Sequence, residues 1–300
     1  MELWIVITVC AAFLQNIRST LQKHLKGHMG TLGATYVRFC FGLPFAAFYV
    51  WLLAAIGGYP LPGPSGLFLF WTALGAVAQI AGTFLLIHLF SFRNFAVGTA
   101  YSRTEPAQAA LFGLLFLGER ASPSLLVALA ISVTGVMLIS VARSAFSPLA
   151  LVTSVWSRNA GIGLLSGMMF GIAAVAYRAA SLELGYPNFM MQAAVTLLWA
   201  LALQTVAMFV WIVVRQRREL ANIAAAWRIS ATVGFVGATA SFGWFMAMTL
   251  QQAAAVKAVA QIEMLFAFAS SVLFFREHIN RLEIAGCVLI VLGILALVLT

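Results

Sequence analysis

Charge is what this sequence has least of. Of its 300 residues only 25 are charged (17 basic and 8 acidic) and aspartate is absent, whereas 63% are hydrophobic. A soluble domain contains about 25% charged residues, so the composition excludes a soluble enzyme and, despite the pI of about 10.1, a soluble nucleic-acid-binding domain. We therefore expect no nucleic-acid partner, and we interpret the net charge of +9 as information on membrane topology.

Cysteine is also scarce. Cys10, Cys40 and Cys287 all lie inside apolar blocks, which excludes a disulfide-stapled secreted domain and gives no metal-binding spacing. No Walker A motif or Gly-rich phosphate loop is present, which excludes direct coupling to ATP. We expect no metal, no cofactor and no catalytic residue. The chain begins Met-Glu-Leu-Trp, without the basic start of a signal peptide, so we expect the first apolar block to be a permanent span.

Long apolar blocks fill most of the chain, and each is near the ~20 residues that cross a bilayer. We predict an all-α integral membrane fold with ten transmembrane helices. Only the connections 143–158 and 215–227 are long enough to hold structure outside the membrane. The predicted spans are 3–22, 31–56, 66–90, 95–117, 121–142, 159–180, 187–214, 228–250, 254–275 and 279–299.

Basic residues are distributed unevenly among the connections. The even-numbered connections contain Arg120 alone, whereas the odd-numbered ones contain eleven of the 17 bases. Lys and Arg in short loops mark the cytoplasmic side, so we expect the odd-numbered loops in the cytoplasm and both termini outside, in the periplasm. The eleven bases are Lys23, Lys26, Arg93, Arg143, Arg158, Arg215, Arg217, Arg218, Arg228, Arg276 and Arg281.

A repeat relates the two halves of the sequence. Segment 96–142 aligns with 254–300 without a gap at a shift of 158 residues, and two pairs of glutamates coincide, among them Glu105 with Glu263. Chance alignment of two apolar segments is the alternative. Each half contains five predicted spans, an odd number, so the halves are expected to be inverted-topology repeats of the kind found in secondary transporters. The predicted parts are a first half (1–142), a connecting segment (143–158) and a second half (159–300).

Short motifs end the fourth and ninth predicted spans, Phe116-Leu117-Gly118-Glu119-Arg120 and Phe274-Phe275-Arg276-Glu277-His278. They resemble the two half-repeats of the drug/metabolite transporter superfamily, and the ten-helix layout is similar to that of its EamA-type members over essentially the full chain. The resemblance implies two inverted five-helix repeats around a central cavity in a bacterial inner membrane, with solute export by alternating access. Within the superfamily the sequence looks most similar to the branch of aromatic amino-acid exporters.

Charged side chains deep in a bilayer cost several kcal/mol unless they are paired or hydrated, so they usually mark a pathway. Arg103 lies about 12 Å into its span at 1.5 Å per residue, and Glu105 and Glu263 are similarly deep. Positions two apart face nearly opposite sides of a helix, so we expect one of Arg103 and Glu105 to line the cavity and the other to bond a neighbouring helix. A structural interhelical ion pair is the alternative. Lys257, nearer the outer face, either snorkels or guards the outer mouth.

Three further arginines lie closer to the ends of their predicted spans. Arg18 and Arg38 are within two turns of the cytoplasmic end, and Arg178 is near the outer end of its span. Long basic side chains near helix ends can extend to the interface. We therefore expect these three side chains to snorkel.

Two prolines interrupt predicted spans. Pro106 cannot donate to the carbonyl of Ser102, so it should kink the fourth span near its middle. A freed carbonyl beside a cavity could receive an ammonium group or a cation. Pro44 frees the carbonyl of Cys40 in the second span in the same way. We interpret Pro106 as a hinge within the site and Pro44 as a hinge alone.

Neutral polar and aromatic residues complete the candidate site. Tyr101, Glu105 and Gln108 are spaced i, i+4 and i+7, one stripe of a continuous helix. Glutamines can equally bond helices together, and a deep tryptophan can simply pack. The remaining candidates are Gln79, Gln261 and Trp244.

The leading hypothesis is a secondary transporter that exports small metabolites, amino acids in particular, by alternating access. Arg103 or Lys257 would bind the substrate carboxylate, Glu105 or Glu263 its ammonium group, and Trp244 would supply an apolar wall. The alternatives are a proton-coupled exporter of drugs or other metabolites and an integral membrane enzyme. We expect the protein not to be an enzyme, and a monomer suffices to build the site because one chain contains both halves.

Overall fold

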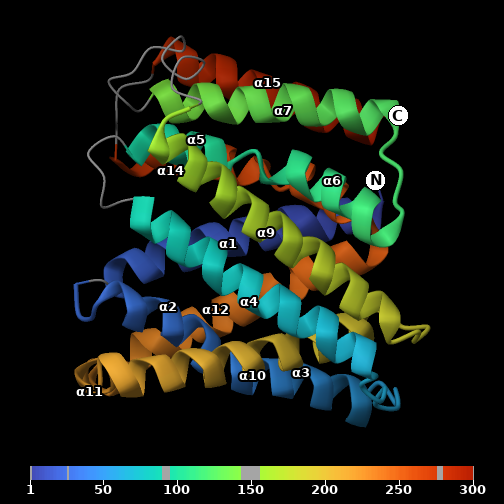
Figure 1. The fold of residues 1–300 in the computed structure, drawn as a ribbon, viewed down its shortest axis with the longest axis vertical. Helices are drawn as coiled ribbons and strands as arrows, with labels where there is room; N and C mark the ends of the chain where they lie inside the picture. Colours follow the sequence, from blue (N-terminus) through green and yellow to red (C-terminus); the bar gives the residue numbers. More distant parts are fainter. Residues whose placement is uncertain (1, 26, 90–94, 143–155, 276–279, 300) are drawn as a thin grey trace. The chain divides into compact units, whose positions relative to one another are not determined.

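The computed structural model describes residues 2–25, 27–89, 95–142, 156–275 and 280–299, and all regular secondary structure in these ranges is α-helical (Figure 1). The helices are α1 (Leu3–Leu25), α2 (Thr31–Cys40), α3 (Leu43–Ala55), α4 (Gly66–Leu89), α5 (Phe95–Ser102), α6 (Glu105–Leu117), α7 (Pro123–Ala142), α9 (Arg158–Glu183), α10 (Phe189–Arg215), α11 (Arg218–Ala225), α12 (Trp227–Leu250), α13 (Ala253–Val259), α14 (Ile262–Phe275) and α15 (Arg281–Val298).

Some sequence predictions fall outside these ranges. Most of the predicted connecting segment, residues 143–155, is among them. The other long connection does contain structure, since the short helix α11 lies within 215–227. Individual residues outside the described ranges are Lys26, Arg93, Arg143, Arg276 and Glu277.

Eight stretches of the described chain are long and apolar enough to cross a membrane. Each coincides with a predicted span. The second of them consists of α2 and α3 together, Thr31–Ala55, interrupted just before Pro44. The eight are α1, α2–α3, α4, α7, α9, α10, α12 and α15.

The other two predicted spans, 95–117 and 254–275, are each divided into two separate helices, so the prediction of one continuous helix over each is wrong. The first is divided into α5 (8 residues) and α6 (13 residues), and the second into α13 (7 residues) and α14 (14 residues). Each piece is shorter than the ~20 residues that a span needs. Ten spans and an inverted topology therefore stay predictions.

Local capping explains where several helices begin and end. The Asn188 side chain accepts hydrogen bonds from two backbone N–H groups at the start of α10, and Asn280 and Glu283 form a capping box at the start of α15. These oxygens satisfy N–H groups that a helix leaves unpaired at its N-terminus. Gly118 ends α6 with φ +66°, a left-handed conformation that glycine adopts without strain.

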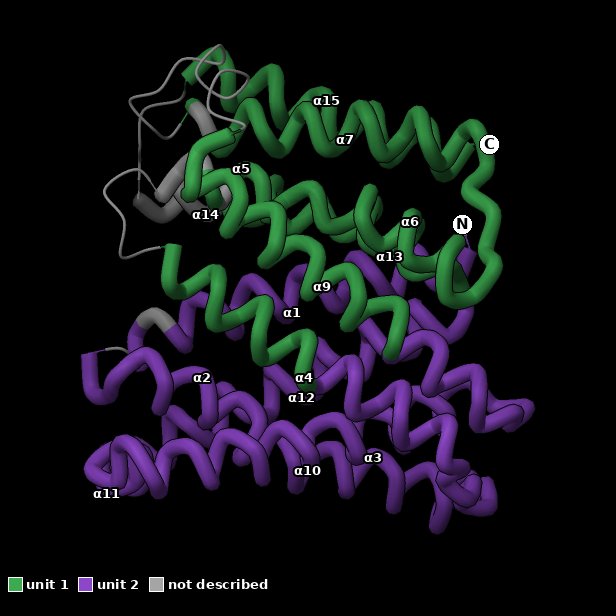
Figure 2. The backbone as a smooth tube through the Cα atoms, viewed as in Figure 1, with its two compact units in different colours: residues 1, 77–176, 251–300 green, residues 2–76, 177–250 purple. Residues whose placement is uncertain are grey.

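The helices form two compact units, drawn in green and purple in Figure 2. Unit 1 contains residues 77–176 and 251–300, and unit 2 contains residues 2–76 and 177–250. Each unit combines helices from both halves that the sequence predicts. The long helices α4 and α9 each contribute to both units.

Glycines bring α7 and α15 of unit 1 into close antiparallel contact. A Cβ atom on Gly135 would lie 2.7 Å from the carbonyl oxygen of Gly286 and 3.0 Å from the backbone nitrogen of Ile290, and one on Gly293 would lie 2.1 Å from Oγ of Ser132. The shift of 158 residues maps Gly135 onto Gly293 and Ser132 onto Ile290. The contact is therefore reciprocal, as expected for two equivalent helices related by a two-fold axis.

Substituting Gly286 with valine should destabilise the protein, because its Cβ would lie 2.6 Å from the carbonyl oxygen of Gly135. Overpacking of this kind costs about 1–3 kcal/mol. Gly161 on α9 is the matched control, since nothing lies within 4 Å of a Cβ built there. Thermal unfolding of the purified protein in detergent should give a clearly lower midpoint for Gly286→Val than for Gly161→Val, and equal midpoints would contradict the packing.

Candidate functional site

The break between α5 and α6 lies where the sequence places its deepest charges. α5 ends at Ser102 and α6 begins at Glu105. Two tight turns join them, because the backbone N–H groups of Arg103 and Thr104 each donate to the carbonyl three residues back, at 3.1 Å. Pro106 lies in the first turn of α6, where a missing N–H is tolerated. The predicted kink is therefore a complete break.

A second break separates α13 from α14 at the equivalent position of the repeat. The N–H groups of Gln261 and Glu263 donate three residues back, at 3.2 and 3.0 Å, and the shift of 158 residues maps Arg103 onto Gln261. No proline lies at this position, so the local sequence did not predict the break. The repeat itself was the available signal, because Pro106 marks the same position in the first half.

Charges at both breaks match the helix dipoles. Glu105 lies in the first turn of α6 and Glu263 in the first turn of α14. Lys257 lies in the last turn of α13. Acids are favourable near the positive N-terminal end of a helix and bases near the negative C-terminal end, each by about 0.3–1 kcal/mol. Each carboxylate thus stabilises the helix end that the break creates.

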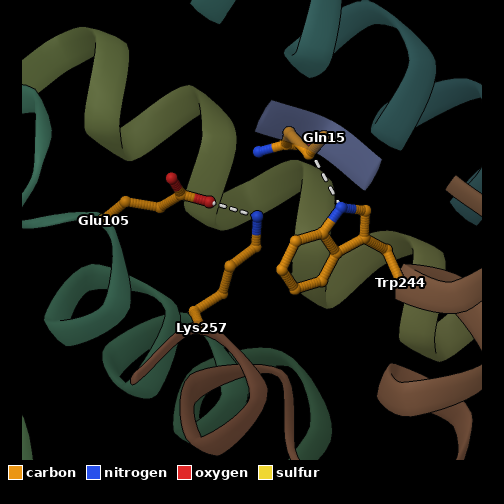
Figure 3. Close-up of polar contacts among 4 residues, drawn as sticks. All are labelled: Gln15, Glu105, Trp244 and Lys257. Atoms are coloured by element: carbon orange, nitrogen blue, oxygen red, sulfur yellow. Dashed lines mark hydrogen bonds and ion pairs between the residues drawn. The ribbon is translucent and has the colours of Figure 1, made fainter. Parts of the chain in front are cut away.

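Lys257 and Glu105 form an ion pair between α13 and α6, both in unit 1 (Figure 3). The Lys257 Nζ atom lies 2.7 Å from Oε1 of Glu105, and the two side chains are 25% and 20% exposed, respectively. Two candidate site residues therefore contact each other directly. The sequence left open whether Glu105 lines the cavity or bonds a neighbouring helix, and in the structure its carboxylate bonds a neighbouring helix.

Arg103 takes no part in this pair. It is half-buried between the two helices and forms no ion pair with any described residue. In the repeat alignment, Thr99 is the residue equivalent to Lys257, and a glutamate occurs in both halves, at Glu105 and Glu263. The carboxylate is therefore duplicated, whereas the base that pairs with it belongs to the second half alone.

Tyr101 and Gln108 lie on different helices because of the first break. Tyr101, on α5, is buried in a cluster with Ala100 and Ala160. The Gln108 side chain, on α6, donates to Oγ1 of Thr104 at 2.8 Å. The stripe predicted by i, i+4, i+7 spacing requires a continuous helix, so it does not exist as one face.

Glycines of α9 pack against the first break within unit 1. A Cβ on Gly163 would lie 2.0 Å from the carbonyl oxygen of Gly98, and one on Gly167 would lie 2.8 Å from that of Ser102. Spaced four apart, these glycines share one helix face and admit the neighbouring backbone. The backbone of the broken helix thus lies close to the backbone of α9 at these two glycines.

Trp244 belongs to unit 2 and is 8% exposed. Its indole Nε1 donates a 3.0 Å hydrogen bond to Oε1 of Gln15, a side chain of α1 (Figure 3). Both residues are inside one unit, so the bond joins α12 to α1. The hydrogen bond supports the alternative role of Trp244 in packing. Its role as an apolar wall for the substrate stays a prediction.

The remaining candidates are distributed over both units. Gln79 is half-buried on α4, and Gln261 is buried at the second break. Pro44 lies in the first turn of α3, directly after the interruption at Phe41 and Gly42 that separates α2 from α3. Its predicted position at a hinge agrees with that interruption.

One surface pocket was not anticipated. It has a volume of about 600 Å³, lies in unit 2, and contains none of the predicted site residues. Its lining includes His28, Asn222, Trp227 and Arg228. The predicted central cavity stays a prediction.

The three arginines expected to snorkel all lie in unit 2, and the structure shows their surroundings. Arg18, on α1, is 7% exposed. The Arg38 Nε atom is buried as well. Arg178, expected to snorkel, instead donates to the backbone carbonyl of Met248. The surroundings of these side chains depend on neighbouring helices, which a hydropathy pattern does not reveal.

Eight apolar helical stretches of membrane length, together with two broken helices that hold charges at equivalent repeat positions, define a multi-pass membrane transport protein. The chain belongs to the EamA-like transporter family, whose profile matches residues 2–141 and 159–299. The resemblance to the drug/metabolite transporter superfamily is thereby confirmed, with one copy in each half. The protein is accordingly a membrane transporter of small metabolites.

Solved structures share this fold. One crystal structure has a TM-score of 0.70 and 17% sequence identity, and the similarity covers 99% of this chain and 96% of that chain. In total, 29 chains of solved structures match. None of the curated proteins matches this chain in sequence.

Removing one partner of the Lys257–Glu105 pair should destabilise the protein more than removing both. Glu105→Gln leaves the ammonium group of Lys257 without its counter-charge, at a cost between the ~0.5 kcal/mol of an exposed pair and the ~3 kcal/mol of a buried one. Unfolding midpoints of Glu105→Gln, Lys257→Met and the double variant would measure this coupling. Additive effects in the double variant would contradict a direct pair.

Proposed function

We propose that this protein exports amino acids from the bacterial cytoplasm as a secondary transporter that works by alternating access. Its membership of a transporter family supports the transport of small metabolites. The observation that supports the amino-acid class is the Lys257–Glu105 pair at the breaks, since these groups are complementary to the carboxylate and ammonium groups of a zwitterion.

Substrate would act by competing for this ion pair. The ammonium group of an amino acid can replace Lys257 at the Glu105 carboxylate, and the released Lys257 can then bind the substrate carboxylate. After the exchange each of the four charges has a partner of opposite sign, so no charge is left unpaired in the membrane. The broken helices provide movable segments, because their turns at 103–104 and 260–261 interrupt the helical hydrogen-bond ladder. Arg103 and Glu263 are further candidate contacts.

Ten spans in two inverted repeats belong to the same proposal. The reciprocal antiparallel contact of α7 and α15 supports it, since equivalent helices of an inverted repeat run in opposite directions. The occurrence of a break at the same position in each half supports it as well. A monomer contains every residue that the proposed site needs.

The proposed orientation puts both termini in the periplasm. It rests on the excess of bases in the odd-numbered connections. A C-terminal alkaline phosphatase fusion, which is active only outside the cytoplasm, should therefore be active in intact cells, and a C-terminal fluorescent protein that requires the cytoplasm should be dark. The reverse pattern would overturn the orientation.

Transport by the purified protein tests the proposed function directly. Proteoliposomes preloaded with an amino acid should take up the same radiolabelled amino acid by counterflow, and Glu105→Gln should reduce the initial rate at least about tenfold, because one charge-assisted bond is worth about 1.5–3 kcal/mol. Glu183→Gln is the control, since this exposed glutamate bonds Ser65 at the end of α9. If none of the twenty amino acids exchanges across the bilayer, the proposal is wrong.

Proton-coupled export of drugs or other metabolites is the second candidate. The observation favouring it is the pair of carboxylates, Glu105 and Glu263, at the helix breaks, because a membrane carboxylate can carry a proton. An imposed pH gradient in the same vesicles distinguishes the two: coupled transport accelerates with the gradient and uncoupled exchange does not. Hydrolysis products in these vesicles would instead indicate a membrane enzyme.

A further inference from the structure

The surface pocket of unit 2 lies where α1 ends and α12 begins. The turn between α1 and α2 supplies His28, α11 supplies Asn222 and Ala225, and the start of α12 supplies Trp227 and Arg228. Figure 2 shows α11 at the end of unit 2 where α2 begins. The volume of about 600 Å³ is within the range of about 300–1,000 Å³ that small-molecule sites occupy. The pocket is therefore large enough to hold a small polar group.

Hydrogen bonds hold the walls of this pocket together. The carboxylate of Glu219, on α11, accepts from the backbone N–H of Gly30 at 3.0 Å, directly before α2. The backbone N–H of His28 donates to the carbonyl of Leu25 at 2.9 Å, and the Asn222 amide donates to Glu219 at 3.5 Å. The turn that carries His28 is thus tied to α11, and the glutamate already serves as an acceptor.

The lining of the pocket suits an anion. Each polar side chain among the described lining residues can donate a hydrogen bond, and none of these residues is acidic. Arg228 is exposed, and its guanidinium carbon lies 5.6 Å from the centroid of the Trp227 ring. Segment 217–228 contains three arginines and one glutamate. A guanidinium group binds a phosphate group through two parallel hydrogen bonds, so phosphate matches both the charge and the donors.

The pocket also lies at the depth of lipid headgroups. Trp227 is the first residue of α12, a helix of membrane length, and is 56% exposed. Tryptophan concentrates at the membrane–water interface. Exposed positions continue along α12 from Arg228 to Thr232 and Phe235, spaced i, i+4 and i+7 on one helix face. This face is charged at the pocket and apolar two turns further along, as a phospholipid is from headgroup to acyl chain.

We infer that this pocket binds the headgroup of an anionic glycerophospholipid, a site that goes beyond the proposed function and does not depend on the exported solute. Arg228 binds the phosphate oxygens, His28 and Asn222 donate further hydrogen bonds, and the acyl chains follow the exposed face of α12 past Phe235. Anionic lipids attract bases beside the membrane surface. A zwitterionic lipid fits less well, because the described lining offers no carboxylate to its cationic group.

Lipid binding to the purified full-length protein in uncharged detergent tests this site. We expect fluorescently labelled phosphatidylglycerol to bind more tightly than labelled phosphatidylcholine, and Arg228→Gln to weaken phosphatidylglycerol binding at least about fivefold. Arg215→Gln is the matched control. Arg215 is exposed and lies over the ring of Trp211, outside the pocket lining, so this variant should bind within about twofold of wild type.

A second variant changes the shape of the pocket and keeps every charge. Ala225 is exposed and lines the pocket, so Ala225→Leu should fill part of it and weaken phosphatidylglycerol binding as well. Unfolding midpoints without lipid check that each variant is folded. If Arg228→Gln and Arg215→Gln lose affinity equally, or if Ala225→Leu binds as wild type does, the lipid is attracted by the general surface charge and the site is wrong.

A soluble phosphate ester is the other source of the same chemistry. Glycerophosphoglycerol carries the headgroup of phosphatidylglycerol without its acyl chains, so it should displace the labelled lipid only at much higher concentration. If it competes as well as unlabelled phosphatidylglycerol does, the pocket is a site for soluble phosphate esters and the lipid inference is overturned. Equal affinity for phosphatidylcholine and phosphatidylglycerol would overturn it too.

Discussion

The structure depends on one constraint: hydrocarbon offers no hydrogen-bond partner to a peptide group. A chain with 63% hydrophobic residues must therefore pair its backbone within helices, and every interruption needs compensation. At both breaks, backbone N–H groups find carbonyls three residues away. The carboxylates of Glu105 and Glu263 lie beside the positive helix ends that follow. The breaks are thus local solutions to the same constraint that makes the rest of the chain helical.

The long spans were predictable because hydropathy is a property of consecutive residues. Eight of the ten predicted spans are helical stretches of membrane length, and the missing N–H of Pro106 indicated the position of the first break. The second break was not predictable locally, since residues 254–275 contain no proline and form a good apolar run. There the tertiary contacts of a repeated element outweighed helix propensity, which is a weak preference.

The partners of the charged residues were harder to predict than their depth. The sequence identified Glu105 and Lys257 as candidates, but their pairing depends on α6 lying against α13, two segments far apart in the chain. The burial of Arg18, which is 7% exposed, was not predictable, because it depends on the helices that pack against α1. A prediction that a side chain snorkels needs those neighbouring helices, and a hydropathy pattern does not show them.

The difference between Lys257 and its repeat equivalent Thr99 has an energetic consequence. In a transporter made of two identical inverted copies, a two-fold axis in the membrane plane would relate the inward-open and outward-open conformations, which would then have equal free energy. Lys257 has Thr99 at its equivalent position, so the two conformations of this chain need not have equal free energy. A difference of about 1.4 kcal/mol in one ion pair makes one conformation tenfold more populated than the other. Under the proposed alternating access, a sequence difference between the two halves, such as Lys257 against Thr99, is then enough to give the empty transporter a resting state.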